Sequence, residues 1–257
     1  MSHTTSSDII LRTEYLCKHF GGLQATHELS LAFERGKVHA ILGPNGAGKT
    51  TLINLLSGEL APSSGKIFFN DTDISHTSVD KRSRLGIGRS FQKTNIFPEF
   101  SCFQNCWVGA QSRLSSSMRF FRPAHQLRDV QRRTERALEL CGLAGRRNSS
   151  ASAMSYGEQR QLEIGIMLAT EPQLLLLDEP LAGMGSDESR QMTELLKQLA
   201  IEHTLILIEH DMDAVFAVAD RLTVMVDGTE LETGSVEQIR NSQSVQEAYL
   251  GSSEDAA

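Results

Sequence analysis

The segment GPNGAGKTT, from Gly43 to Thr51, constrains the fold of this chain more than any other feature. The apolar residues Val38 to Leu42 before it predict a buried strand, and the helical spacing of the apolar residues after it predicts a helix. Glycines in such a loop let the backbone turn its N–H groups toward a phosphate, which the N-terminus of the following helix also favours. We therefore predict a phosphate-binding loop made of Gly43, Pro44, Asn45, Gly46, Ala47, Gly48, Lys49, Thr50 and Thr51.

Two side chains of this loop carry chemistry of their own. Lys49 places a positive charge near the outer phosphates of a nucleotide, and the Thr50 hydroxyl is a ligand for Mg²⁺. The strand before the loop and the helix after it distinguish a nucleotide loop from a chance match of the same letters.

A second feature is the run of four leucines from Leu174 to Leu177, which ends at Asp178 and Glu179. A run that is apolar on both faces favours a parallel strand covered by helices on each side. Carboxylates at the carboxyl end of such a strand lie at the crevice where α/β folds bind ligands. We predict that Asp178 holds Mg²⁺ through water and that Glu179 orients or deprotonates an attacking water. The alternative is an ordinary Asp-Glu-Pro turn.

The segment Ser155 to Arg160 lies between these two features, and with them it resembles the nucleotide-binding subunits of ATP-binding cassette transporters. The resemblance extends from about Ile9 to Leu250. It implies that ATP and Mg²⁺ are the cofactors and that this signature segment opens a helix whose N-terminus contacts the γ-phosphate of ATP on an opposite protomer. The contacting residues would be Ser155, Gly157 and Glu158.

The chain departs from the commonest family pattern at two places. The signature is usually Leu-Ser-Gly-Gly-Gln, and this chain has Met154, Tyr156 and Glu158 at the first, third and fifth positions. We expect the Tyr156 side chain to point away from phosphate because it replaces a glycine. Many relatives have an aspartate where this chain has Gly185, which leaves the coupling between two ATP sites open.

The resemblance assigns three further residues. His210, which follows the apolar segment Leu205 to Ile208, matches a histidine that contacts the γ-phosphate, although a lone histidine is more often structural. Gln92 matches a glutamine that senses Mg²⁺ and the attacking water. Phe20 matches an aromatic residue that stacks on adenine, and the alternative for it is a core phenylalanine at a strand end.

The fold implied by the resemblance is an α/β P-loop NTPase. It has a RecA-like parallel-sheet core, an N-terminal antiparallel β subdomain and an inserted α-helical subdomain. We expect one ATPase domain over residues 8–250, with a core at about 9–92 and 166–250 and a helical subdomain at about 93–165. Residues 1–7 and 251–257 are expected to be flexible tails. The local pattern also predicts strands at Leu29–Phe33, Lys66–Phe69 and Thr204–Ile208, helices near 187–200 and 212–219, and a hairpin turning at Asp227–Gly228.

Composition limits which partners, such as a membrane, nucleic acid or a metal ion, this chain is expected to have. No apolar run approaches the ~18–20 residues of a membrane span, and the first ten residues lack the features of a secretory signal. A net charge of −7 argues against nucleic acid as a partner. The four cysteines form no CxxC pair, so buried thiols are favoured over a metal site. The arginines of segment 128–136 favour a solvated surface, with contact to acidic lipid or to a partner as the alternative.

We expect a transport ATPase at the cytoplasmic face of the membrane. The alternative from another class is a soluble cassette ATPase of translation or DNA repair, although this chain has neither a second cassette nor a coiled-coil insert. The segments Phe20–Leu23, Ser90–Gln92, Glu209–Met212 and Ala248–Gly251 resemble ATPases of branched-chain amino acid uptake systems. Urea and short-chain amide importers and lipopolysaccharide-export ATPases are the runners-up.

The resemblance also implies partners. These are transmembrane permease subunits, a second ATPase subunit (identical or different) in a head-to-tail dimer and, indirectly, an extracytoplasmic binding protein. The aromatic-rich stretch from Gln92 to about Gln111 is the predicted docking surface for the permease.

Overall fold

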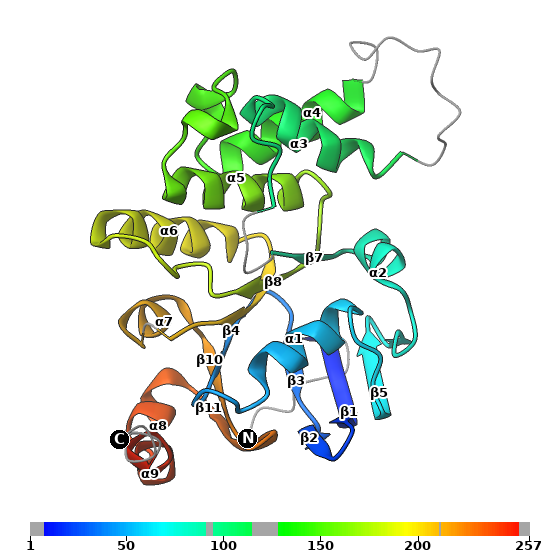
Figure 1. Ribbon diagram of the computed structural model, residues 1–257, viewed down its shortest axis with the longest axis vertical. Coiled ribbons are helices and arrows are strands. Elements are labelled where there is room, and N and C mark those ends of the chain that lie inside the picture. Colours follow the sequence, from blue (N-terminus) through cyan, green and yellow to red (C-terminus); the bar gives the residue numbers. More distant parts are fainter. Residues whose placement is uncertain (1–7, 91–94, 115–127, 211, 252–257) are drawn as a thin grey trace.

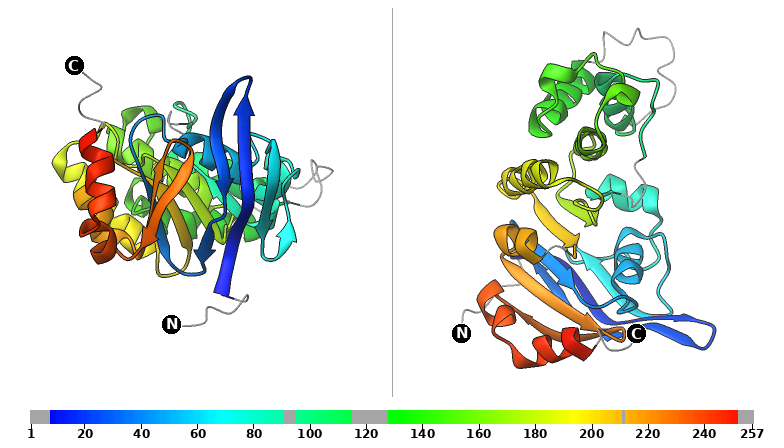
Figure 2. Two further views of the ribbon diagram at one scale, coloured as in Figure 1. Left: turned by 90° about the horizontal axis from the view of Figure 1, so that it is seen from below. Right: turned by 60° about the vertical axis from the view of Figure 1, so that its left-hand side comes forward.

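The structure is a computed structural model that describes residues 8–90, 95–114, 128–210 and 212–251. Two sheets lie at one end of the molecule and a layer of three helices at the other (Figure 1). The helices of that layer are α3 (Cys102–Gln111), α4 (Arg128–Leu140) and α5 (Tyr156–Leu168), and we call them the helical layer. The right-hand view of Figure 2 shows the helical layer standing over the sheets.

The larger sheet is mostly parallel, and its strand order is β11-β10-β4-β9-β8-β7. Its central strands are short and apolar, which suits a sheet covered on both faces. Only β11 runs antiparallel to its neighbour, β10. The strands are β4 (Val38–Leu42), β7 (Ile87–Arg89), β8 (Leu174–Asp178), β9 (Thr204–Ile208), β10 (Arg221–Val226) and β11 (Thr229–Gly234).

The run of four leucines in β8 is buried on both faces of this sheet. Leu174 and Leu176 belong to a core shared with the antiparallel sheet, whereas Leu175 and Leu177 belong to the core under the helices. Alternate residues of a strand point to opposite faces, so one apolar run serves two cores.

The smaller sheet is antiparallel, with the strand order β2-β1-β5-β6 and with β3 paired to β1. Its strands are β1 (Ile9–Phe20), β2 (Leu23–Leu29), β3 (Ala32–Glu34), β5 (Ser64–Phe69) and β6 (Thr72–Asp73). The predicted strand Leu29–Phe33 is therefore divided between β2 and β3. The long strand β1 has no simple sequence signal because its register shifts within the strand and Tyr15 has a positive φ of 47°.

The remaining helices flank the sheets. They are α1 (Lys49–Ser57), α2 (Val79–Leu85), α6 (Ser186–Leu199), α7 (Met212–Val218), α8 (Val236–Arg240) and α9 (Gln243–Gly251), with 3₁₀ turns at Ala144–Arg146 and Ala151–Ala153. No helix in the described ranges is both long and apolar enough to cross a membrane.

Inside the helical layer the thiols of Cys102, Cys106 and Cys141 are buried and unpaired by disulfides. Gly165 of α5 lies against two of them, since a Cβ there would be 2.8 Å from the Cys141 sulfur and 3.2 Å from the Cys106 sulfur. Burial raises the pKa of Cys141 to about 12, so this thiol stays protonated and packs as an apolar group. Among the described residues, no group of three or more His, Cys, Asp or Glu side chains is placed to hold a metal ion.

Candidate nucleotide site

The glycine-rich loop joins β4 to α1 and is shaped by close backbone contacts. Gly43 and Gly48 have φ angles of 148° and 92°, and Gly48 is the N-cap of α1. A Cβ on Gly43 would be 2.1 Å from the Met225 carbonyl oxygen, and one on Gly48 would be 2.3 Å from that of Ala25. Strands β2 and β10 thus hold the loop in a form that only glycine permits at these two positions.

Lys49 is the first residue of α1 and is buried. Its ammonium group donates to the carbonyl oxygens of Gly43, at 2.6 Å, and Pro44, at 2.9 Å. Burial lowers the pKa of Lys49, and the carboxylates of Glu179 and Asp178 oppose that shift. The loop therefore holds a cation on its own carbonyl oxygens, and a cation within a glycine-rich loop attracts phosphate.

Most of the predicted nucleotide residues line one cavity of about 300 Å³. Its lining consists of Phe20, Leu23, Gln24, Ala25, Asn45, Gly46, Ala47, Gly48, Lys49, Thr50, Thr51, Glu179 and His210. Phe20 is 46% exposed at the end of β1, with the Lys18 ammonium 5.2 Å from its ring centroid. An aromatic ring that is half in solvent has a free face, so Phe20 is available for stacking and is not a core residue.

Asp178 ends β8 and is completely buried. Neither of its carboxylate oxygens has a hydrogen-bond partner in the described part of the chain. Burial raises the pKa of Asp178, and the guanidinium of Arg89 opposes that shift. A buried carboxylate without a partner calls for a cation or water, so Asp178 is suited to a Mg²⁺ site. Thr50 lines the cavity, whereas Asp178 does not. Gln92, the third predicted metal residue, lies outside the described residues.

Glu179 and His210 meet at the edge of the cavity. The Glu179 Oε1 atom lies 2.6 Å from His210 Nε2, and the Glu179 N–H donates to the Ile208 carbonyl at 2.9 Å. Glu179 has a φ of 50°, a conformation that costs free energy in a non-glycine residue and is concentrated at functional sites. The β8 and β9 strand ends thus place a carboxylate and an imidazole in contact across 31 residues of sequence.

Sequence reasoning did not assign a role to Glu209, the residue before His210. Its buried carboxylate accepts hydrogen bonds from the N–H groups of Leu181, at 2.6 Å, and His210, at 3.2 Å. Burial raises the pKa of Glu209, and these two hydrogen bonds oppose that shift. Glu209 therefore joins the turn after Glu179 to the end of β9. The sequence did contain a signal for this role, because Glu209 is a charged residue directly after the apolar strand β9.

The signature segment lies at the start of α5, and none of its residues lines the cavity. Ser155 and Glu158 form a capping box, in which each side chain accepts from the other residue's N–H. Glu158 also pairs with Arg146 at 3.2 Å. The Ser155 hydroxyl and the Gly157 N–H both donate to Glu188 of α6, at 2.9 and 3.1 Å.

Tyr156 occupies the position of a usual glycine in the signature. Its ring lies near Gly183, where a Cβ would be 3.5 Å from the ring, and near the Arg160 guanidinium, 5.7 Å from the ring centroid. The tyrosine therefore packs on the turn that follows Glu179.

The arginine-rich helix α4 holds its charges in ion pairs. Arg133 pairs with Glu171 at 3.0 Å, and Arg136 pairs with Glu202. Arg132 pairs with Asp129 at 3.4 Å. Local carboxylates thus neutralise three of the four arginines, which favours the solvated-surface interpretation.

Together, the P-loop, the two strand-end carboxylates and the central parallel sheet define a nucleotide-binding site of the P-loop type. Residues 26–182 match the family model of the ABC transporter. The chain is 36% identical over 255 residues to the high-affinity branched-chain amino acid transport ATP-binding protein LivG of Escherichia coli. The alignment covers 95% of this chain and 99% of that protein. It is also 33% identical to a probable LivG of Archaeoglobus fulgidus, over 94% of this chain and 95% of that protein.

Solved structures agree. The ADP conformation of an ATP-binding cassette of an ABC transporter superposes with a TM-score of 0.83 and 29% identity, over 95% of this chain and 99% of that one. A nucleotide-free cassette gives a TM-score of 0.81 and 30% identity, over 94% and 98%. The chain belongs to the ABC transporter family and is one of its ATPase subunits. The predicted family and fold class are confirmed.

Proposed function

We propose that this chain binds ATP with Mg²⁺ and hydrolyses it through the residues around the cavity. Lys49 and the loop N–H groups bind the outer phosphates, and Phe20 stacks on adenine. Thr50 and Asp178 would hold Mg²⁺, which neutralises phosphate charge when bound. Glu179 accepts a proton from the attacking water, and His210, already in contact with Glu179, donates to the γ-phosphate.

The site becomes complete only with a second ATPase subunit, identical or different, arranged head to tail. The observation that supports this proposal is the separation of the signature from the cavity: Lys49, Glu179 and His210 line it, whereas no residue from 155 to 158 does. A helix N-terminus with a serine and a glycine is suited to bind phosphate. In the proposed dimer, Ser155 and Gly157 contact ATP held by the other protomer.

The transporter that we propose takes up branched-chain amino acids, because the similar proteins of both Escherichia coli and Archaeoglobus fulgidus carry that description. The chain would act at the cytoplasmic face of the cell membrane, bound to permease subunits, while an extracytoplasmic binding protein delivers the substrate. A sharp test is uptake by cells whose only copy of this subunit carries Glu179→Gln. Labelled leucine uptake should fall to background and urea uptake should stay unchanged, and the reverse pattern would assign the urea class instead.

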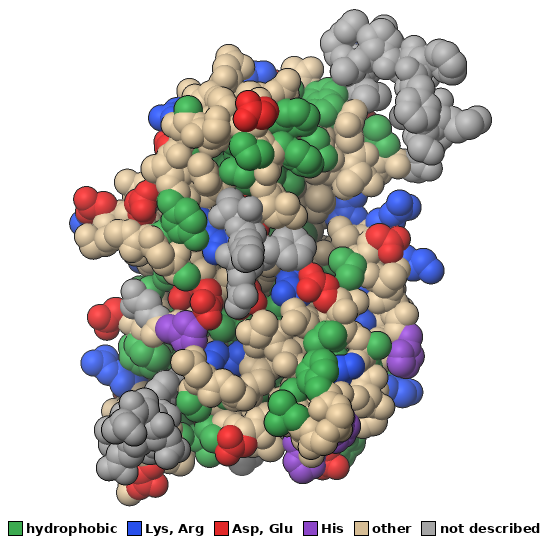
Figure 3. Space-filling view, viewed as in Figure 1, with side chains coloured by type: hydrophobic (Ala, Val, Ile, Leu, Met, Phe, Trp, Pro, Cys, Tyr) green, Lys and Arg blue, Asp and Glu red, His purple; other side chains and the backbone are tan. Residues whose placement is uncertain are grey.

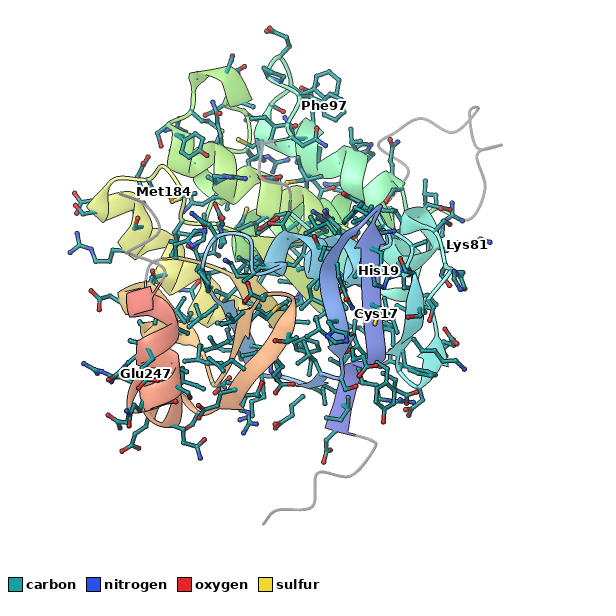
Figure 4. The ribbon with its side chains drawn as sticks, turned by 60° about the horizontal axis from the view of Figure 1, so that its bottom comes forward. Cys17, His19, Lys81, Phe97, Met184 and Glu247 are labelled. Atoms are coloured by element: carbon teal, nitrogen blue, oxygen red, sulfur yellow. The ribbon has the colours of Figure 1, made fainter. Side chains whose placement is uncertain are left out.

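The permease surface that we propose is the loop before α3. Phe97 and Phe100 are stacked with centroids 5.2 Å apart, yet they are 48% and 39% exposed. Figure 4 places Phe97 at the outer edge of the helical layer, and Figure 3 shows hydrophobic side chains gathered over that layer. Buried Asn105 fixes the loop, since its side chain accepts from the Phe97 N–H and donates to the Phe97 carbonyl. Because Phe97 and Phe100 are apolar, exposed and fixed in place, they are suited to contact with a protein partner.

A cavity of about 210 Å³ lies between β7, α2 and α5, beside the start of this loop. Asn95 supplies part of its lining, together with Arg89 of β7 and Ile166 of α5. A short helix of a permease that rests on Phe97 would therefore also contact the junction between the core and the helical layer.

The docking proposal is tested by Phe97→Asp with Ile201→Asp as the matched control. Ile201 is 82% exposed and lies after α6, so it receives the same charge away from the proposed surface. Phe97→Asp should move the subunit to the soluble fraction and abolish uptake, while the purified chain keeps its ATPase rate. Membrane binding and uptake that match those of Ile201→Asp would place the docking surface elsewhere.

A further inference from the structure

Glu188 makes an unusual set of contacts for a partly exposed acidic residue at the start of a helix. It lies in the first turn of α6, whose N-cap is Gly185 without a side-chain cap. Its Oε1 atom accepts hydrogen bonds from the Ser155 hydroxyl at 2.9 Å and from the Gly157 N–H at 3.1 Å. The hydrogen bonds from Ser155, Gly157 and Gly185 hold the pKa of Glu188 below its usual value, so this group is a carboxylate at neutral pH.

One carboxylate thus lies at the N-termini of two helices, α5 and α6. Both helix ends favour a negative charge there, because their first N–H groups have no partner within the helix. A carboxylate oxygen has the same charge sign and the same acceptor chemistry as a phosphate oxygen. Glu188 therefore supplies, within one chain, what the signature would take from a nucleotide.

We propose that Glu188 occupies the phosphate-binding donors of the signature in the free protomer and has to leave them before ATP on a second protomer can bind there. This inference rests on the two-chain arrangement given under the proposed function. A hydroxyl donates a single hydrogen and the N–H donates one, so Glu188 and a γ-phosphate cannot both hold Ser155 and Gly157. Two negative groups in one place also repel each other.

The contact is suited to exchange rather than to permanent structure. Glu188 is only partly buried, and it reaches the signature from a different helix, 33 residues away from Ser155. Because α6 directly follows the turn after Glu179, release of Glu188 would free the signature and that turn to move apart. As a consequence, the dimer closes only above an ATP concentration that is sufficient to displace the Glu188 carboxylate from the signature.

The test measures ATP-dependent dimerisation by light scattering in a Glu179→Gln background, where hydrolysis is slow. The chain is studied alone and mixed with the second ATPase of its transporter. Adding Glu188→Gln or Glu188→Ala should lower the ATP concentration for half-maximal dimerisation by about threefold to tenfold, the range set by losing one charged hydrogen-bonding group. Thermal melting establishes that each variant is folded, and the glutamine variant keeps an acceptor for the end of α6.

Asp187→Asn is the matched control. Asp187 is the neighbouring residue in the same helical turn, carries the same charge and pairs with Arg190 rather than with the signature. It should leave the ATP requirement within about twofold of the parent, since an exposed surface ion pair contributes little. If both Glu188 variants need as much ATP as Asp187→Asn or more, the inference is wrong. If the parent forms no dimer in either pairing, the two-chain arrangement itself is wrong.

Discussion

The phosphate loop and the signature segment are both glycine-containing turns at a helix N-terminus, yet they treat their backbone donors differently. Gly48 begins α1 with no side-chain cap, so the first N–H groups of that helix are left for a ligand. Ser155 begins α5 with a capping box, and Glu188 takes the Gly157 N–H as well. The first region leaves its backbone donors without a side-chain cap, whereas the second satisfies its own donors within the chain.

Packing explains this difference. The phosphate loop is clamped between β2 and β10, and its glycines meet backbone atoms that cannot move aside. Gly157 of the signature instead meets the Glu188 side chain, since a Cβ on Gly157 would be 2.8 Å from Glu188 Oε1. We therefore call the phosphate loop the rigid region and the signature the adjustable region, because only the contact at Gly157 is made by a side chain that can rotate.

The largest expected effect is on ATP hydrolysis at the phosphate loop and its neighbour Glu179, and it distinguishes ATP binding from catalysis. Glu179→Gln should bind ATP normally but lower turnover by about 10²–10⁴ because the general base is lost. Lys49→Ala should instead weaken ATP binding. Nucleotide affinity and steady-state hydrolysis, measured on both variants, distinguish the two roles. Wild-type turnover in Glu179→Gln would show that another residue is the base.

The next largest effect is expected from a substitution in the signature. In a Glu179→Gln background, Ser155→Arg should abolish the ATP-dependent dimer, because a bulky side chain would occupy the position of the phosphate. Light scattering with and without ATP provides the measurement, and ATP affinity of the single chain should be unchanged. A dimer that persists would show that the signature does not face nucleotide across the interface.

A pair of glycine substitutions compares the two regions directly through folding stability. Gly48→Ala should lower the free energy of unfolding by about 3 kcal/mol, since alanine strains at a φ of 92° and meets the Ala25 carbonyl. Gly157→Ala should change it by less than about 1 kcal/mol, because helix propensity favours alanine and Glu188 can rotate away. Urea unfolding of both variants gives the values. Equal losses would remove the contrast between a rigid loop and an adjustable one.

The smallest effect concerns the strand that carries the phosphate loop. His39 of β4 accepts a hydrogen bond from the Glu34 N–H at 2.8 Å, and burial lowers its pKa to about 4. The unfolded chain, with an ordinary histidine pKa near 6.5, binds the proton more readily. Stability is therefore full above about pH 6.5 and is lost as the pH falls toward 4. Lowering the pH from 7 to 5 should cost about 2 kcal/mol.

The control for this prediction is His39→Gln, which keeps an acceptor but does not titrate. Denaturant unfolding at pH 7 and 5 should show a smaller loss for His39→Gln than for the parent. An identical loss in both would mean that other groups cause the pH dependence.

The sequence by itself determined the parts that depend on local pattern. Gly43 to Thr51 predicted the loop, the four leucines predicted a strand buried on both faces, and Asp227–Gly228 predicted the hairpin turn, where both residues have positive φ. These features follow from backbone geometry and side-chain periodicity within about ten residues, so the letters are sufficient.

Tertiary structure alone decided which side chains meet. No local pattern relates Glu209 to the Leu181 N–H, 28 residues away, or Glu188 to Ser155, 33 residues away. Nor could the letters show that both oxygens of Asp178 lie buried without a hydrogen-bond partner among the described residues. Such contacts depend on how strand ends and helices pack, and that packing is set by the two cores on either side of the sheet rather than by neighbours along the chain.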